Sequence, residues 1–281
     1  MSLRFGRQMV SIPGPSTTPD RVLNAMHRPM PNIYEGELVE LAYEMMDRLP
    51  AIARTTGEPF IIISNGHGAW QMAINNTLSG GDDVLVLESG RFAQAWGAMA
   101  ATGGVKVEHL AGDYRTAVDL DAFAERIAAD TERRIKAVLM VLTDTATSVK
   151  NDVAAIGAVL QAADHPALFM VDAIASLGCD VYEMDAWGVD VTVAASQKGL
   201  MVPPGLGFVW AGPRALAAYD SAGLKDGYTD WGPRRSPEVM YQLFAGTPPI
   251  QHLFGLREAL NMIDEEGGLE NVWNRHAVLA G

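Results

Sequence analysis

Short apolar runs alternate with longer amphipathic stretches over most of the chain. The runs at 59–64, 83–88, 105–110 and 135–142 have the length and composition of strands, and a stretch with helical periodicity follows each of them. Strands and helices that alternate at this spacing form βαβ units, in which the strands lie parallel. The pattern therefore predicts an α/β fold with a mostly parallel central sheet and helices on both faces.

Two further apolar runs end in charged residues. The first ends in Val171-Asp172-Ala173, and the second ends in Ser196-Gln197-Lys198-Gly199. Such runs are typical of parallel strands that are buried on both faces. Open α/β sheets bind their ligands at the carboxyl ends of these strands. The pattern therefore predicts that Asp172 and Lys198 lie at the ligand-binding edge of the sheet.

Asp172 and Lys198 together indicate pyridoxal phosphate chemistry. A partly desolvated lysine loses its proton near neutral pH and becomes a nucleophile that forms a Schiff base with a carbonyl. A carboxylate nearby keeps a pyridinium nitrogen protonated, which pyridoxal phosphate needs in order to act as an electron sink. Each residue alone has an ordinary structural explanation, with Lys198 extending to solvent and Asp172 capping the next helix. We interpret the pair as catalytic because of the motifs around it.

A glycine-rich turn follows the strand at 59–64. It consists of Asn65-Gly66-His67-Gly68-Ala69, and a helix is predicted after it at 70–78. Backbone N–H groups at a helix start can bind a phosphate, and the helix dipole favours the negative charge. The segment is therefore a candidate phosphate cradle. Two alternatives stay open: a turn that only tightens the strand–helix connection, and a buried His67 bonded to the backbone.

Two more segments bring candidate ligands to the same edge of the sheet. Phe92 begins the helix predicted at 92–102, where its ring can stack on an aromatic cofactor or simply pack in the core. The strand at 135–142 ends in the run Thr143-Asp144-Thr145-Ala146-Thr147-Ser148. These hydroxyls can bind a phosphate or a phenolic oxygen, or they can cap the helix predicted to begin near Asp152.

The chain is predicted to have three parts. Residues 1–20 form an N-terminal arm, because the proline-rich segment at 12–16 cannot be helical. Residues 21–250 form a large cofactor-binding domain, in which 206–211 is an antiparallel edge strand. Residues 251–281 begin a small C-terminal domain, and we expect the sequence to be truncated because it stops directly after a helical pattern. Further helices are predicted at 20–26, 37–55, 119–130, 213–219, 250–265 and from 269 onward, and irregular segments at 226–235 and 244–249.

Composition and charge narrow the classes of partner. The 281 residues include 34 acidic and 21 basic ones, and the formal net charge of −13 argues against nucleic acid or an anionic membrane as the main partner. The sequence contains no apolar run of about 18 residues that could span a membrane. The single cysteine, Cys179, cannot form an internal disulfide, so a reducing compartment, the cytoplasm, is expected.

As a set, these motifs resemble those of the class V pyridoxal-phosphate aminotransferases of fold type I, specifically the alanine–glyoxylate and serine–glyoxylate group. The resemblance covers 12–281 and rests mainly on the stretch Val171-Asp172-Ala173-Ile174-Ala175-Ser176-Leu177-Gly178 and on Ser196-Gln197-Lys198-Gly199 followed by Pro203-Pro204-Gly205. It implies pyridoxal 5′-phosphate as cofactor. It also implies transfer of an amino group from a small donor of alanine or serine type to glyoxylate or pyruvate, by a ping-pong mechanism.

The resemblance implies a role for each matching residue. Lys198 would bind the cofactor aldehyde and shuttle a proton, and Asp172 would pair with the pyridine nitrogen. Ile174 would pack on the ring face opposite Phe92. Thr247 would reach the phosphate of a partner subunit, which implies a homodimer with shared active sites. The other implied cofactor ligands are Gly66, His67, Gly68 and Gln197 at the phosphate, and Thr145 beside the ring.

The sequence also departs from the family pattern, which leaves substrate choice open. Phe244 stands where relatives carry a phosphate-binding tyrosine. Family members continue into a small domain that supplies an arginine for the substrate carboxylate, so this arginine is expected beyond residue 281. The alternatives are a ureidoglycine–glyoxylate or pyridoxamine–pyruvate type of aminotransferase, and a non-catalytic protein that binds pyridoxal phosphate. A cysteine desulfurase is disfavoured, because Gln197 stands where those enzymes usually carry histidine and Cys179 is predicted to be buried.

Overall fold

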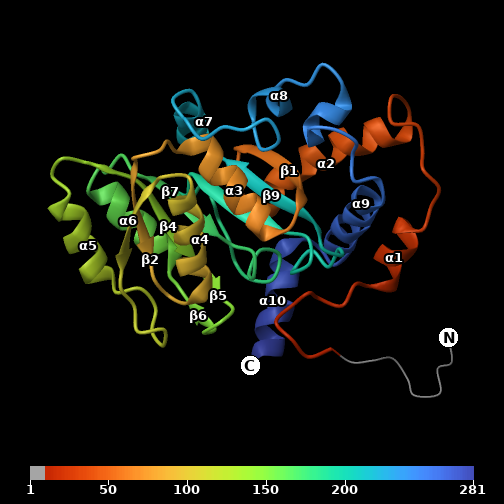
Figure 1. Cartoon of the computed structure of the whole chain (residues 1–281). Helices are drawn as coiled ribbons and strands as arrows, with labels where there is room; N and C mark the ends of the chain where they lie inside the picture. Colours follow the sequence, from red (N-terminus) through yellow and green to blue (C-terminus); the bar gives the residue numbers. More distant parts are fainter. Residues whose placement is uncertain (1–9) are drawn as a thin grey trace.

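The computed structural model describes residues 10–281, so residues 1–9 of the predicted N-terminal arm lie outside the described part. The elements follow one another in the alternating order that the sequence predicts (Figure 1). In chain order they are α1 (Asp20–Met26), α2 (Glu37–Ala53), β1 (Glu58–Ser64), α3 (Gly66–Thr77), β2 (Asp83–Leu87), α4 (Arg91–Thr102), β3 (Lys106–Leu110), α5 (Leu120–Ala129), β4 (Ile135–Val141), β5 (Thr143–Asp144), β6 (Val149–Lys150), α6 (Val153–Ala162), β7 (Leu168–Asp172), β8 (Val191–Ala195), β9 (Gly205–Ala211), α7 (Pro213–Tyr219), α8 (Gly232–Arg235), η1 (Met240–Phe244), α9 (Ile250–Glu265) and α10 (Leu269–Ala280).

Seven strands form one sheet in the order β1-β9-β8-β7-β4-β2-β3. Strands β8, β7, β4, β2 and β3 pair in parallel, and β9 runs antiparallel to both of its neighbours, which confirms the mostly parallel sheet. The prediction that β9 forms the edge is wrong. Strand β1 pairs along its whole length, from Glu58 opposite Ala211 to Ser64 opposite Gly205. Every residue of β9 after Gly205 is buried, whereas β1 exposes Ile63, so β1 is the better suited of the two to an edge.

Helices cover both faces of the sheet, as predicted. On one face, α3, α4 and α7 pack against alternate strand residues, such as Leu139 and Val141 of β4. On the other face, α2, α5, α6 and α9 pack against the residues between them, such as Val138 and Met140. Figure 1 shows α3 and α4 lying over the strands on the first face. This alternation follows from the period of two residues along a strand.

Helix α3 begins earlier than predicted. The glycine-rich segment is the first turn of this helix rather than a loop before it, since α3 starts at Gly66 and not at Trp70. Asn65 is the N-cap, and its side-chain oxygen accepts the backbone N–H of His67 at 3.0 Å. An asparagine cap offsets the low helix propensity of the two glycines that follow it. The helix start therefore lies directly at the end of β1.

Helix α9 belongs to the same core as the strands. Its buried side chains join the apolar cluster on the α2 face of the sheet. Helix α1 packs closely on it, because a Cβ at Gly255 would lie 2.8 Å from Cγ of Met26. Arg21 of α1 also forms ion pairs with Glu258 and Glu265. The division of the chain into a large and a small domain at residue 250 stays a prediction.

No helix within residues 10–281 is long and apolar enough to cross a membrane.

Candidate active site

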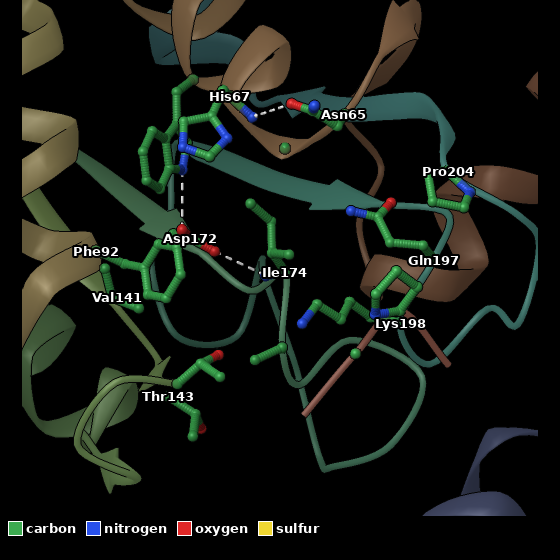
Figure 2. Close-up of a pocket in the computed structure, with 16 residues that line it drawn as sticks. Asn65, His67, Phe92, Val141, Thr143, Asp172, Ile174, Gln197, Lys198 and Pro204 are labelled. Carbon is green, nitrogen blue, oxygen red and sulfur yellow. Dashed lines mark hydrogen bonds between the residues drawn. The ribbon is translucent and has the colours of Figure 1, made fainter. Parts of the chain in front are cut away.

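The carboxyl ends of the parallel strands and the starts of two helices enclose one cavity of about 340 Å³ (Figure 2). Strand β7 contributes its last residue, Asp172, and residues just past its end, and β8 contributes residues just past its end. Strands β1 and β2 lead into the first turns of α3 and α4. This volume lies in the range of small-molecule sites. Eight of the ten predicted site residues line the cavity: Gly66, His67, Phe92, Thr145, Asp172, Ile174, Gln197 and Lys198.

Two predicted site residues do not line this cavity. Gly68 faces β1, where a Cβ would come within 2.2 Å of Oγ of Ser64, so its small size serves the packing of α3 on the sheet. Thr247 is exposed in the segment between η1 and α9. Its predicted role belongs to the site of a partner subunit, so it stays a prediction.

Asp172 is buried at the end of β7 and accepts two hydrogen bonds. The indole N–H of Trp70 donates to Oδ2 at 2.8 Å, and the backbone N–H of Ile174 donates to Oδ1 at 2.7 Å (Figure 2). Burial raises the pKa of Asp172 to about 7, although the two donors act in the opposite direction. A cationic N–H group placed against this carboxylate would favour its ionised form. The site is thus suited to a protonated ring nitrogen.

Lys198 lies at the end of β8 and is half-buried. Its Nζ donates a hydrogen bond to the backbone carbonyl of Pro13 at 2.8 Å. Burial lowers the pKa of the Lys198 amine below its ordinary range, and the attraction of Asp172 offsets this only in part. Such an amine is neutral, and therefore nucleophilic, in a larger fraction of molecules than an exposed lysine at pH 7.

The N-terminal arm closes one side of the site, which the sequence did not predict. The backbone N–H of Ser16 donates to the carbonyl of Gln197 at 2.8 Å, and its hydroxyl donates to the carbonyl of Lys198 at 2.9 Å. Gly14 has φ of +131°, and a Cβ there would lie 2.5 Å from Nζ of Lys198. Residues 13–16 of the arm therefore pack on the lysine of their own chain.

Aromatic and apolar side chains form the wall of the cavity. Trp70 has its ring centroid 4.7 Å from that of His67 and 6.3 Å from that of Phe92. Ile174 approaches the start of α3 so closely that a Cβ at Gly66 would lie 2.3 Å from its Cδ1. Phe92 and Ile174 both line the cavity (Figure 2), and their contact with a planar ring stays a prediction.

The end of the cavity at the start of α3 is suited to an anion. The first turn of α3 presents backbone N–H groups that have no acceptor within the helix, and the helix dipole is positive there. Oε1 of Gln197 is buried and has no hydrogen-bond partner among residues 10–281. Figure 2 shows its amide nitrogen directed into the cavity near the start of α3. The N–H groups of this amide can donate to a phosphate, whereas its unpaired oxygen can only accept a hydrogen bond.

The residues present fit pyridoxal phosphate. The cavity contains a carboxylate for the ring nitrogen, an amine for the aldehyde, apolar side chains for the ring faces and donors for the phosphate. Sequence reasoning missed three contributors: Trp70, the arm at 13–16 and Asp144, whose carboxylate binds the first turn of α4. Trp70 had a weak signal, a bulky aromatic residue in the helix after the glycine-rich segment. All three contacts join segments distant in sequence, and for the other two the local pattern holds no sign.

Comparison with known proteins agrees with this geometry. The family profile described as "Aminotransferase class-V" matches residues 13–281. A serine–glyoxylate aminotransferase of Methylorubrum extorquens is 38% identical over 98% of this chain and 70% of its own length. An L-aspartate–glyoxylate aminotransferase of Paracoccus denitrificans is 36% identical over 96% of this chain and 68% of its own. The crystal structure of ureidoglycine–glyoxylate aminotransferase from Bacillus subtilis superposes with a TM-score of 0.86 and 25% identity, and covers 96% of this chain and 70% of that one.

Proposed function

The chain belongs to the class-V aminotransferases, and on this premise we propose that it is a pyridoxal-phosphate-dependent enzyme. It moves an amino group from a small donor of alanine or serine type to glyoxylate or pyruvate in two half-reactions. Family membership confirms the resemblance predicted from the motifs. The names of the relatives support glyoxylate as the acceptor and include serine, aspartate, alanine and ureidoglycine as donors.

One observation carries the proposal: Asp172 and Lys198 lie at the ends of neighbouring strands in one cavity and have pKa values shifted in opposite directions. Bound pyridoxal phosphate supplies an aldehyde and an electron-withdrawing ring. Lys198 would hold the aldehyde end of the cofactor, because its lowered pKa leaves its amine partly neutral, and it would carry a proton at Nζ. Asp172 in its ionised form would keep the ring nitrogen protonated, which a neutral carboxyl would not do.

The remaining residues bind and orient the cofactor. We assign the phosphate to the first turn of α3, at Gly66 and His67, and to the amide N–H groups of Gln197, which point into the cavity. The backbone N–H of His67, which bonds Oδ1 of Asn65 in this structure, would turn to the phosphate. Phe92 and Ile174 exclude water from the ring faces, and the hydroxyl of Thr145 lies beside the ring. These assignments account for the mixture of apolar walls and polar ends in the cavity.

We further propose a homodimer in which Thr247 binds the phosphate of the partner subunit. Thr247 is exposed, and so is Tyr34, which is 74% exposed although its ring contacts that of Tyr241 in η1. Exposed aromatic residues of this size are enriched in protein interfaces. Phe244 is almost fully buried in the core of its own chain, so it serves packing rather than a phosphate. The free Cys179 is compatible with the cytoplasmic location that we propose.

Absorbance spectroscopy of the purified protein tests the proposed function. The protein is loaded with pyridoxal phosphate and titrated with L-alanine, L-serine, L-aspartate and pyridoxamine in turn. We expect one donor to bleach the visible band of the bound cofactor, and glyoxylate or pyruvate to restore it. A protein that binds the cofactor but responds to none of the donors would support a non-catalytic binding protein instead. A protein that takes up no cofactor would contradict the proposal as a whole.

A further inference from the structure

A carboxylate that the proposed chemistry does not use lies behind the cavity. Asp144 ends the two-residue strand β5 and has no exposed surface. Its Oδ2 accepts the backbone N–H groups of Phe92 at 2.8 Å and Ala93 at 3.1 Å, and its Oδ1 accepts that of Ala146 at 3.0 Å. Backbone N–H groups on two different segments thus share the two oxygens of one side chain.

Asp144 replaces a local cap that helix α4 lacks. The N-cap residue of α4 is Gly90, which has no side chain to accept a hydrogen bond. The carboxylate of Asp144 takes this role instead, although it lies 52 residues after Phe92 in the sequence. The approach is close, because a Cβ at Gly90 would lie 2.4 Å from Cγ of Asp144. The glycine therefore admits the carboxylate, and the negative charge is favourable at a helix start.

The other oxygen fixes the turn between β5 and β6. Asp144 binds the N–H group of the peptide that joins Thr145 to Ala146. A second contact ties the same turn to the entrance of α4, since Oγ1 of Thr147 donates to the carbonyl of Ser89 at 2.9 Å. Figure 1 shows β5 beside α4, consistent with these contacts.

Both tethered segments carry residues that line the cavity. Phe92 lies in the first turn of α4, and Thr145 lies in the turn after β5. We propose that Asp144 is a positioning residue of the cofactor site, whose carboxylate holds Phe92 and Thr145 at fixed places relative to each other. This inference rests on the proposed function, because it assigns both side chains to pyridoxal phosphate. Asp144 itself does not line the cavity and is not a catalytic residue.

Asp144→Asn tests the inference with little change in volume. An asparagine side chain has one oxygen and one amide nitrogen. The nitrogen would face a backbone N–H group, so the side chain would lose its hydrogen bonds either to the first turn of α4 or to Ala146. The dissociation constant of pyridoxal phosphate is measured by quenching of tryptophan fluorescence, and the ordering of the ring by visible circular dichroism of the bound cofactor. We expect a dissociation constant about tenfold higher and a weaker dichroic band per bound cofactor.

Asp119→Asn is the matched control. Asp119 caps α5 by accepting the N–H groups of Asp121 at 2.9 Å and Ala122 at 3.1 Å, and it does not line this cavity. It should leave cofactor affinity and the dichroic band unchanged. Thermal unfolding of both variants without cofactor measures how far the loss of each helix cap lowers the melting temperature. This effect on stability is thereby separated from any effect on the cofactor site.

The outcomes distinguish this inference from the proposed function. A wild-type chain that binds no pyridoxal phosphate contradicts the proposed function. If the wild type binds and Asp144→Asn shows only a lower melting temperature, with unchanged affinity and dichroism, the positioning role is wrong. If Asp144→Asn does not fold, Thr147→Val leaves Asp144 in place and removes the hydrogen bond to the carbonyl of Ser89, together with the one that the hydroxyl accepts from the N–H of Val149. This variant should raise the dissociation constant about threefold. Unchanged affinity in folded Thr147→Val would also overturn the inference.

Discussion

Asp172 and Lys198 occupy equivalent places, each just at the end of a neighbouring parallel strand, yet their surroundings differ. Asp172 is buried and bonded to Trp70 and to the backbone of the core. Lys198 is half-buried, and its amine is bonded to the arm through the carbonyl of Pro13. Burial raises the pKa of the carboxyl to about 7 and lowers the pKa of the amine.

This difference shows how one physical effect prepares two opposite chemistries. Desolvation penalises the charged form of either group, so it moves the pKa of a carboxyl upward and that of an amine downward. The amine gains nucleophilic character from this shift. The carboxyl needs a cationic partner to remain ionised, and a pyridinium nitrogen provides one.

The largest effect is expected from Lys198→Ala. Without the amine, the chain has no nucleophile at the end of β8, and we expect turnover to fall by about 10³-fold or more. Turnover is measured with the donor that the titration identifies. Lys150→Ala removes an exposed lysine that pairs with Asp180 outside this cavity and serves as the control. Substantial turnover in Lys198→Ala would remove Lys198 from the account.

Asp172→Asn should reduce turnover by about 100-fold while leaving cofactor binding measurable. The amide keeps the size of the carboxylate but has no negative charge to hold the proton of the ring nitrogen. Cofactor affinity and turnover are measured on the same preparation, so that loss of binding is not mistaken for loss of chemistry. Near-normal turnover would show that the ring nitrogen needs no anion here.

The comparison also indicates what the sequence could reveal. Apolar runs ending in Asp172 and Lys198 predicted the parallel strands and the ligand edge, because strand period and burial are local properties of the chain. The pattern at 206–211 predicted an antiparallel strand correctly but not its place inside the sheet. The place of a strand in the sheet depends on which other strands pair with it, and β1, which pairs with β9, lies far from it in the sequence.

The residues missed in the site share one physical property. Trp70, Asp144 and the arm at 13–16 act through contacts with segments far away in sequence. Their roles appear only when the strands are assembled. The helix start at Gly66 was missed for a different reason, because two glycines weaken the helical signal and the asparagine cap outweighs them.

The raised pKa of Asp172 predicts a pH dependence of stability in the protein without cofactor. Between about pH 4 and pH 7 the unfolded chain has lost the proton of Asp172 while the folded chain retains it. The contribution of this group to the free energy of unfolding therefore decreases as pH rises through this window, by up to about 4 kcal/mol, and levels off above it.

Chemical denaturation of the wild type and Asp172→Asn across pH 4 to 8 isolates this contribution. The stability of the wild type relative to the variant should decrease from pH 4 to pH 7 and then remain constant. Parallel curves would show that the carboxyl titrates normally in the folded protein.

A smaller effect is expected from Trp70→Phe, which removes one of the two donors to Asp172. Loss of this hydrogen bond destabilises the ionised carboxylate, so the pKa of Asp172 should rise further. Because turnover requires the ionised form, the acidic limb of its pH profile should move to higher pH, with about a tenfold loss at the acidic end. Turnover as a function of pH measures this shift. A uniform loss at all pH values would indicate a packing defect instead.

Reduction of the pyridoxal-phosphate-loaded protein with borohydride, followed by proteolysis and mass spectrometry, tests the central claim most directly. Borohydride fixes a lysine-bound cofactor permanently, so the modified peptide identifies the residue that holds it. The account predicts the phosphopyridoxyl group on Lys198, in the peptide that contains Ser196-Gln197-Lys198-Gly199. A modification on another lysine, or none in a protein that has taken up the cofactor, would contradict it.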